Sequence, residues 1–195
     1  PFRLESGVEL PDLTLVYETW GSLNAEKNNA VLVHHALSVG AHARKQVGNP
    51  DFGWWQKTIG PGKAIDTDKY FVICINNLGS CFGSTGPLSL NAETGRPFGG
   101  DFPDITISDM TASQKLLTDR LGIERFHTVI GGSMGAMLCL DWAINYPDSL
   151  DNLVLISSSY KAYPANIANR SIQHQAIRMD PMWNGGNYAS SHELT

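Results

Sequence analysis

The sequence predicts an α/β fold built on a mostly parallel sheet, and three observations point to this class. Five short apolar runs rich in β-branched and aromatic residues are spread along the 195 residues, as expected for strands. Helical patterns separate the later runs, an alternation that is typical of parallel strands joined by crossover helices. The length suits one domain or most of one, with enough chain to bury a core.

The expected strands are the five apolar runs themselves. They cover residues 13–20, 30–35, 70–76, 126–130 and 152–158. Three of the runs are nearly continuous in Val, Ile, Leu and Phe, which predicts strands that are covered on both faces of the sheet.

Two helices are expected between the later strands. Residues 108–122 predict a helix that is capped by Ser108 and stopped by Gly122. Its apolar face would be formed by Met110, Leu116, Leu117 and Leu121. The apolar segment that starts at Met134 predicts a second, buried helix that is closed by Pro147.

Two further segments interrupt or follow this alternation. Residues 77–104 are rich in Gly, Pro, Ser and Asn, and they predict a long loop of the kind that is usually functional in a compact domain. After residue 160, the pattern indicates a helix around 164–179 and then a loop that contains glycines. It does not return to a strand.

Composition argues against several classes of protein. The net charge is −5 and no run of Lys or Arg occurs, so nucleic acid is not an expected partner. No apolar run approaches the roughly 18 residues that a membrane span needs, and the first residues do not resemble a signal peptide. Three cysteines without C-x-x-C spacing do not form a disulfide framework, so a reducing cytoplasm is the expected location.

The segment Gly131-Gly132-Ser133-Met134-Gly135 is a G-x-S-x-G pattern. An expected strand ends directly before it and an expected helix begins directly after it, as a nucleophile elbow requires. Ser133 is therefore the candidate catalytic nucleophile. The backbone N–H of Met134 would form half of an oxyanion hole, and that of Leu37, or a close neighbour after the strand at 30–35, would form the other half. The alternative is a glycine-rich turn in which Ser133 has no catalytic role.

Three histidines near the second strand are candidate metal ligands. His34 and His35 are adjacent and would point to opposite faces of a strand, and neither pairs with His42 in an H-x-x-x-H spacing. We therefore expect no metal site. In this fold class, a histidine after that strand more often supports the oxyanion loop.

A serine nucleophile needs a histidine as base and a carboxylate that orients the histidine. Only one clear strand follows Ser133, whereas these partners normally lie on loops after later strands. His174 falls inside the expected final helix, and Asp180 and His192 follow without an intervening strand. We interpret all three as scaffold or surface residues, and we expect the catalytic Asp and His beyond Thr195.

Three long stretches resemble the homoserine O-acetyltransferase family, a branch of the α/β-hydrolase fold that transfers acyl groups. They are "HHALSVGAHA", residues 54–110 from "WWQKTIGPGK" to "DITISDM", and "VIGGSMGAMLCLDWAINYPD". The segment "NIANRSIQHQAIRMDPMWNGGNY" resembles the part that leads toward the family's lid. The resemblance divides the chain into the N-terminal part of the core, residues 1–160, and the start of a lid, residues 161–195.

This resemblance implies that an acetyl group passes from acetyl-CoA, a co-substrate, to the hydroxyl of L-homoserine through an acyl-Ser133 intermediate. It implies small-molecule substrates, no permanently bound cofactor, and a possible homodimer. The chain departs from the family at Ala136, in "HALSVG", and at His174. Succinyl transfer to serine or homoserine, ester or thioester hydrolysis, and an inactive fragment remain alternatives. We expect acetyl rather than succinyl, because Arg170 and Arg178 are interpreted as lying on a solvated helix face.

Overall fold

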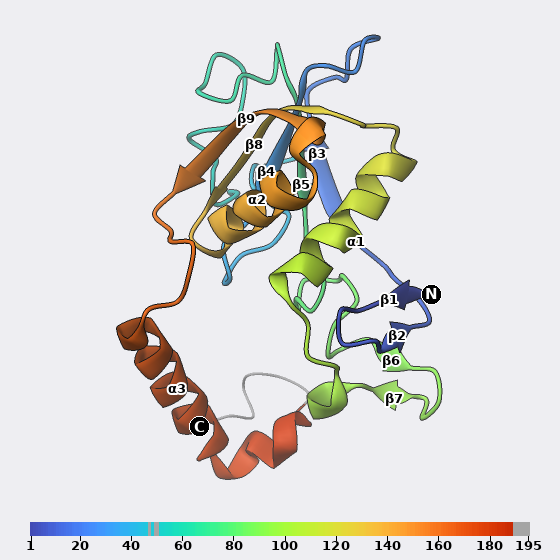
Figure 1. Ribbon diagram of the computed structural model, residues 1–195, viewed down its shortest axis with the longest axis vertical. Coiled ribbons are helices and arrows are strands. Elements are labelled where there is room, and N and C mark those ends of the chain that lie inside the picture. Colours follow the sequence, from blue (N-terminus) through green and yellow to red (C-terminus); the bar gives the residue numbers. More distant parts are fainter. Residues whose placement is uncertain (47, 49–50, 189–195) are drawn as a thin grey trace.

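A five-stranded sheet forms the centre of the computed structural model, which describes residues 1–46, 48 and 51–188 (Figure 1). The strand order is β3-β5-β4-β8-β9. The strands are β3 (Tyr17–Trp20), β4 (Ala30–His34), β5 (Phe71–Ile75), β8 (Phe126–Gly132) and β9 (Leu150–Ile156). Only β3 runs antiparallel to its neighbour, and the other pairings are parallel. The predicted mostly parallel sheet is confirmed.

Two apolar clusters lie on opposite faces of the sheet. Along β4, Ala30 and Leu32 belong to one cluster, whereas Val31 and Val33 belong to the other. This alternation follows from the two-residue repeat of a strand. Trp142 of helix α2 (Met134–Asn145) completes the first cluster, and the second is covered by irregular chain that supplies Ile59 and Ile65. β4 and β5 are thus covered on both faces, as predicted.

The last strand, β9, contradicts that prediction. Its side chains from Leu153 to Ile156 are 37–47% exposed, although their apolar sequence is typical of a buried strand. The reason is position, because β9 forms an edge of the sheet among the described residues and pairs there with β8 only.

Helix α1 (Ile107–Arg120) begins one residue before the predicted helix, and its cap is Thr106. The Thr106 hydroxyl accepts a hydrogen bond from the Asp109 N–H at 3.1 Å, and the Asp109 carboxylate accepts one from the Thr106 N–H at 2.9 Å. This reciprocal capping box satisfies two N–H groups at the helix start. The prediction of Ser108 as the cap was therefore wrong.

The buried face of α1 is more polar than predicted. Leu116 is 46% exposed, so its assignment to the apolar face was wrong. Ser108 instead donates a hydrogen bond to the Asp141 carboxylate of α2 at 2.7 Å, and Thr111 donates to the same carboxylate. A polar contact between α1 and α2 thus replaces part of the expected apolar one. The predicted stop is confirmed, since Gly122 follows the helix with φ +70°.

The remaining elements are short, apart from α3 (Pro164–Arg178), which lies close to its predicted range. They are β1 (Phe2–Arg3), β2 (Glu9–Leu10), β6 (Leu90–Asn91), β7 (Arg96–Pro97) and the 3-10 turns η1 (Gly99–Asp101), η2 (Pro147–Ser149) and η3 (Pro181–Gly186). Figure 1 shows α2 across one face of the sheet and α3 away from it, beyond the chain that follows β9. Among the described residues, no helix has the length and apolar character that crossing a bilayer requires.

Candidate active site

Ser133 occupies a one-residue turn between a strand and a helix. β8 ends at Gly132 and α2 begins at Met134, and the backbone of Ser133 has φ 56° and ψ −122°. L-residues rarely adopt such a conformation, because the side chain is crowded by the backbone. Ser133 is exposed at the carboxyl end of β8. These features match the predicted nucleophile elbow, whose strained turn presents the serine hydroxyl outward.

Two glycines of the motif allow α2 to approach the sheet closely. A Cβ atom on Gly135 would lie only 2.2 Å from the carbonyl oxygen of His34. A Cβ atom on Gly131 would lie 2.5 Å from the backbone of Gly135. Any larger residue would force the start of α2 away from β4 and β8. The glycines are therefore required for packing, and they fix the position of Ser133.

The chain after β4 passes beside this turn. His34 at the end of β4 is opposite Gly131 in the parallel register, and Leu37 follows three residues later. Among the described residues, the backbone N–H groups of Leu37 and Met134 donate none of the turn and loop hydrogen bonds. Met134 is also the first helical residue, so its N–H has no partner within the helix. The arrangement suits the predicted oxyanion hole, which stays a prediction.

His34 is buried completely, beside the ring of Trp142 at a centroid distance of 5.8 Å. Within the described residues, neither ring nitrogen has a well-formed hydrogen bond. Burial, and to a lesser extent the neighbouring His35, lower the pKa of His34 to about 3, against a smaller opposing effect of Gln114. His34 is therefore a neutral core residue at physiological pH.

His35 bridges the ends of two strands. Its Nε2 accepts a hydrogen bond from the Asn77 N–H at 3.0 Å, so Nδ1 carries the proton and donates to the Ala36 carbonyl at 2.8 Å. The Gln114 amide in turn donates to the Asn77 side-chain oxygen at 2.7 Å. Burial lowers the pKa of His35, although the Ala36 bond opposes this. This network holds the backbone directly before Leu37, in line with the expected support of the oxyanion loop.

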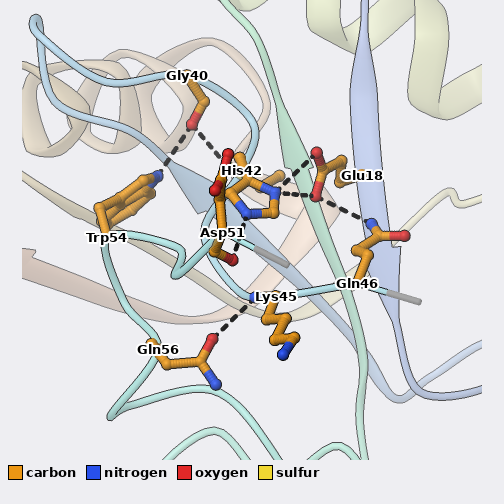
Figure 2. A network of polar contacts seen from close by, with 9 residues as sticks. Glu18, Gly40, His42, Lys45, Gln46, Asp51, Trp54 and Gln56 are labelled. Atoms are coloured by element: carbon orange, nitrogen blue, oxygen red, sulfur yellow. Dashed lines mark hydrogen bonds and ion pairs between the residues drawn. The ribbon is translucent and has the colours of Figure 1, made fainter. Parts of the chain in front are cut away.

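His42 lies in a separate polar network, shown in Figure 2. Its Nδ1 is 3.0 Å from the carboxylate of Glu18 on β3, and its Nε2 is 3.1 Å from the backbone oxygen of Asp51. Partial burial lowers the pKa of His42, but the bonds to Asp51 and Glu18 outweigh this and raise it. Since β5 and β4 separate β3 from β8, this pair is not adjacent to Ser133. The sequence alone did not indicate the partner Glu18.

None of the three histidines shares a metal-binding cluster in the part of the chain that the structure describes. No group of three His, Cys, Asp or Glu side chains gathers there in a suitable arrangement.

A cleft of about 970 Å³ opens beside Ser133, between the end of β9 and helix α3. Ser157, Ser158 and Ser159 line it from the chain after β9. The carboxyl ends of parallel strands meet at one edge of a sheet, and ligands commonly bind outside that edge. No sequence motif marks these serines as functional, although their position at the end of an expected strand is a usable signal.

Helix α3 presents cationic side chains to the same cleft. Arg170 and Arg178 line it together with His174. The interpretation that the two arginines lie on a solvated face was incomplete, because that exposed face borders the cleft of Ser133. His174 is exposed and has no carboxylate partner among the described residues. Asp180 caps η3 by accepting from the Met182 N–H, and His192 lies outside the described residues.

Comparisons with known proteins place these features in context. The model of the family described as "alpha/beta hydrolase fold" matches residues 29–194. The chain is 51% identical to a homoserine O-acetyltransferase of Rhodospirillum rubrum over 191 residues, which cover 96% of this chain and 48% of that protein. It is 49% identical to a serine O-succinyltransferase of Litchfieldella anticariensis over 189 residues, which cover 97% of this chain and 52% of that protein.

A crystal structure of esterase E22 is also similar, with a TM-score of 0.90 and 35% identity over 98% of this chain and 54% of that one. The chain thus spans about half the length of the curated relatives described above.

Proposed function

The chain belongs to the α/β-hydrolase fold family, and on that premise we propose that it is the nucleophile-bearing part of a homoserine O-acetyltransferase. The observation that carries this proposal is the strained, exposed Ser133 between β8 and α2. Sequence similarity to acyltransferases of amino-acid hydroxyl groups supports it. The substrates would be small molecules, an acyl-CoA and L-homoserine, in the route to methionine.

The proposed reaction has two steps. First, the hydroxyl oxygen of Ser133 attacks the thioester carbonyl of acetyl-CoA, and the N–H groups of Leu37 and Met134 stabilise the oxyanion. The C–S bond breaks, CoA leaves as the thiol with the serine proton, and an acetyl ester of Ser133 remains. Second, the homoserine hydroxyl attacks this ester. Its proton returns to Ser133, and O-acetylhomoserine leaves.

Both proton transfers require a base, for which we propose a His–Asp pair beyond Thr195. The exposed apolar edge of β9 supports this idea, because such a strand is normally covered by further strands and helices. Residues 1–160 would then be the N-terminal part of the core, and residues 161–195 would begin a lid. As an isolated unit of 195 residues, the chain would be an inactive fragment.

Acetyl-CoA is proposed as a transient co-substrate, without a resident cofactor. Succinyl transfer to serine or homoserine is the principal alternative, since relatives with those names have similar identity. The three cysteines form no disulfide, and the exposed Cys81 suits a reducing cytoplasm. A homodimer is part of the same proposal.

Hydrolysis is a second candidate activity, favoured by the structural similarity to esterase E22. The same acyl-Ser133 would then be cleaved by water. We propose to separate the two with the protein expressed at the full length of its natural reading frame. Thiol release from acetyl-CoA is measured with and without homoserine, and O-acetylhomoserine is quantified by mass spectrometry. Transferase activity predicts release that depends on homoserine and is lost in Ser133→Ala. Equal release without homoserine would favour hydrolysis.

A further inference from the structure

The cleft beside Ser133 is cationic, although the chain as a whole carries a net charge of −5. Arg170 and Arg178 contribute two permanent positive charges, and none of the residues that line the cleft is an Asp or Glu. Among the described residues, no carboxylate forms an ion pair with either arginine. Arg170 donates one hydrogen bond to Gln173 at 3.0 Å. Two exposed guanidinium groups without an acidic partner in the described part of the chain are well suited to an anionic ligand.

Spacing on the helix indicates the shape of that ligand. Arg170, His174 and Arg178 are separated by four residues each, so they share one face of α3. With a rise of 1.5 Å per residue, the two arginines are about 12 Å apart along the helix axis. Where both side chains extend straight from the helix, one carboxylate is too small to bridge their guanidinium groups. Phosphate groups distributed along an extended molecule match the spacing of the two arginines better.

We infer that Arg170 and Arg178 bind the phosphate groups of the acyl-CoA donor, and that this face of α3 positions the donor over Ser133. The inference rests on the proposed function, since it takes the donor to be a CoA thioester. A CoA molecule carries a diphosphate and a 3′-phosphate at the end remote from the thioester. Helix α3, with 15 residues, is about 22 Å long, and it can follow such an extended donor.

The test uses the full-length protein with Arg170→Gln, Arg178→Gln and the double variant. Arg120→Gln is the matched control, because Arg120 is also exposed, on α1, but lies outside the cleft. We expect each cleft variant to raise KM for acetyl-CoA about tenfold, as for loss of a charge-assisted hydrogen bond. The value of kcat should change little. With S-acetyl-N-acetylcysteamine, a thioester without phosphate, KM should be the same in all variants and the wild type.

A comparison of acetyl-CoA with succinyl-CoA shows whether the arginines bind the phosphates or the acyl carboxylate of the donor. An equal rise of KM for acetyl-CoA and for succinyl-CoA in the cleft variants supports phosphate binding. A rise of KM for succinyl-CoA only would overturn the inference and assign the arginines to the acyl carboxylate. Unchanged KM values for both CoA donors would also overturn the inference. O-acetylhomoserine formed by the wild type would still uphold the proposed function in that case.

If the wild type transfers no acyl group, the proposed function fails, and calorimetry with CoA decides the inference. At least tenfold weaker CoA binding by the double variant supports it, and equal binding contradicts it.

Discussion

The backbone conformation that presents the Ser133 hydroxyl for the proposed catalysis also lowers the stability of the folded chain. The backbone dihedrals of φ 56° and ψ −122° are unfavourable for any residue with a Cβ atom. Strain of this kind persists where the surrounding structure enforces it, and it is often found at active sites. Here the enforcing contacts are the close approach of Gly135 to His34 and the hydrogen bond from the Ser133 N–H to the Ile156 carbonyl.

Relief of this strain is measurable. Ser133→Gly should unfold with a free energy about 1–2 kcal/mol higher than Ser133→Ala, because glycine tolerates a positive φ. Both variants lack the hydroxyl, so the comparison isolates the backbone. Urea denaturation of the two proteins provides the free energies. If the alanine variant is equally stable or more stable, the turn is not strained.

His34 predicts a pH dependence of stability. Its pKa is lowered to about 3 in the folded chain by burial and should be near 6.5 in the unfolded chain. The unfolded state therefore binds an additional proton as the pH falls from 6.5 toward 3, and stability is lost across that window. One such histidine contributes at most about 1.4 kcal/mol per pH unit.

The comparison is with His34→Gln, which removes the titrating group. Urea unfolding at pH 7 and pH 5 should show a smaller loss of stability in the variant than in the wild type. Equal losses in the two proteins would show that His34 does not titrate differently on unfolding.

Among the elements, the start of α2 is the one that the motif fixes most tightly. Gly135→Ala should destabilise the protein by about 1–3 kcal/mol, because the new methyl group would overlap the His34 carbonyl. Gly132→Ala is the matched control within the same motif. Its Cβ atom would meet no atom closer than 3.8 Å, so thermal unfolding should change little. Equal effects of the two substitutions would contradict the packing argument.

The elements also show what the sequence can and cannot predict. Apolar runs located β4, β5 and β8, and the glycines located the turn at Ser133, because these signals are local. The polar face of α1 was missed because Ser108 and Thr111 are satisfied by Asp141, which is some 30 residues away in the chain. The orientation of Arg170 toward the cleft was missed for a similar reason, since it depends on where α3 lies relative to β9.

For the whole molecule, the central question is which groups complete the reaction. His174 lines the cleft, but no carboxylate within the described ranges pairs with it and would orient it. Without a base, the hydroxyl of Ser133 stays protonated near neutral pH and is a weak nucleophile. We therefore predict negligible transfer to homoserine by the isolated chain of 195 residues.

Activity assays of this isolated chain and of the protein at the full length of its reading frame test that prediction. His174→Gln in the longer protein is the accompanying variant, and it should retain most of the wild-type kcat. Full activity of the isolated chain, or loss of activity in His174→Gln, would identify a base within residues 1–195 and refute the proposed His–Asp pair.

The most direct test of the central claim is to trap the acyl-enzyme. The full-length protein is incubated with acetyl-CoA in the absence of homoserine, digested, and analysed by mass spectrometry. We predict that the peptide that contains Ser133 gains the mass of one acetyl group, that homoserine removes it, and that Ser133→Ala abolishes it. Labelling that persists in Ser133→Ala, or that appears on a different peptide, would contradict the assignment of Ser133 as the nucleophile.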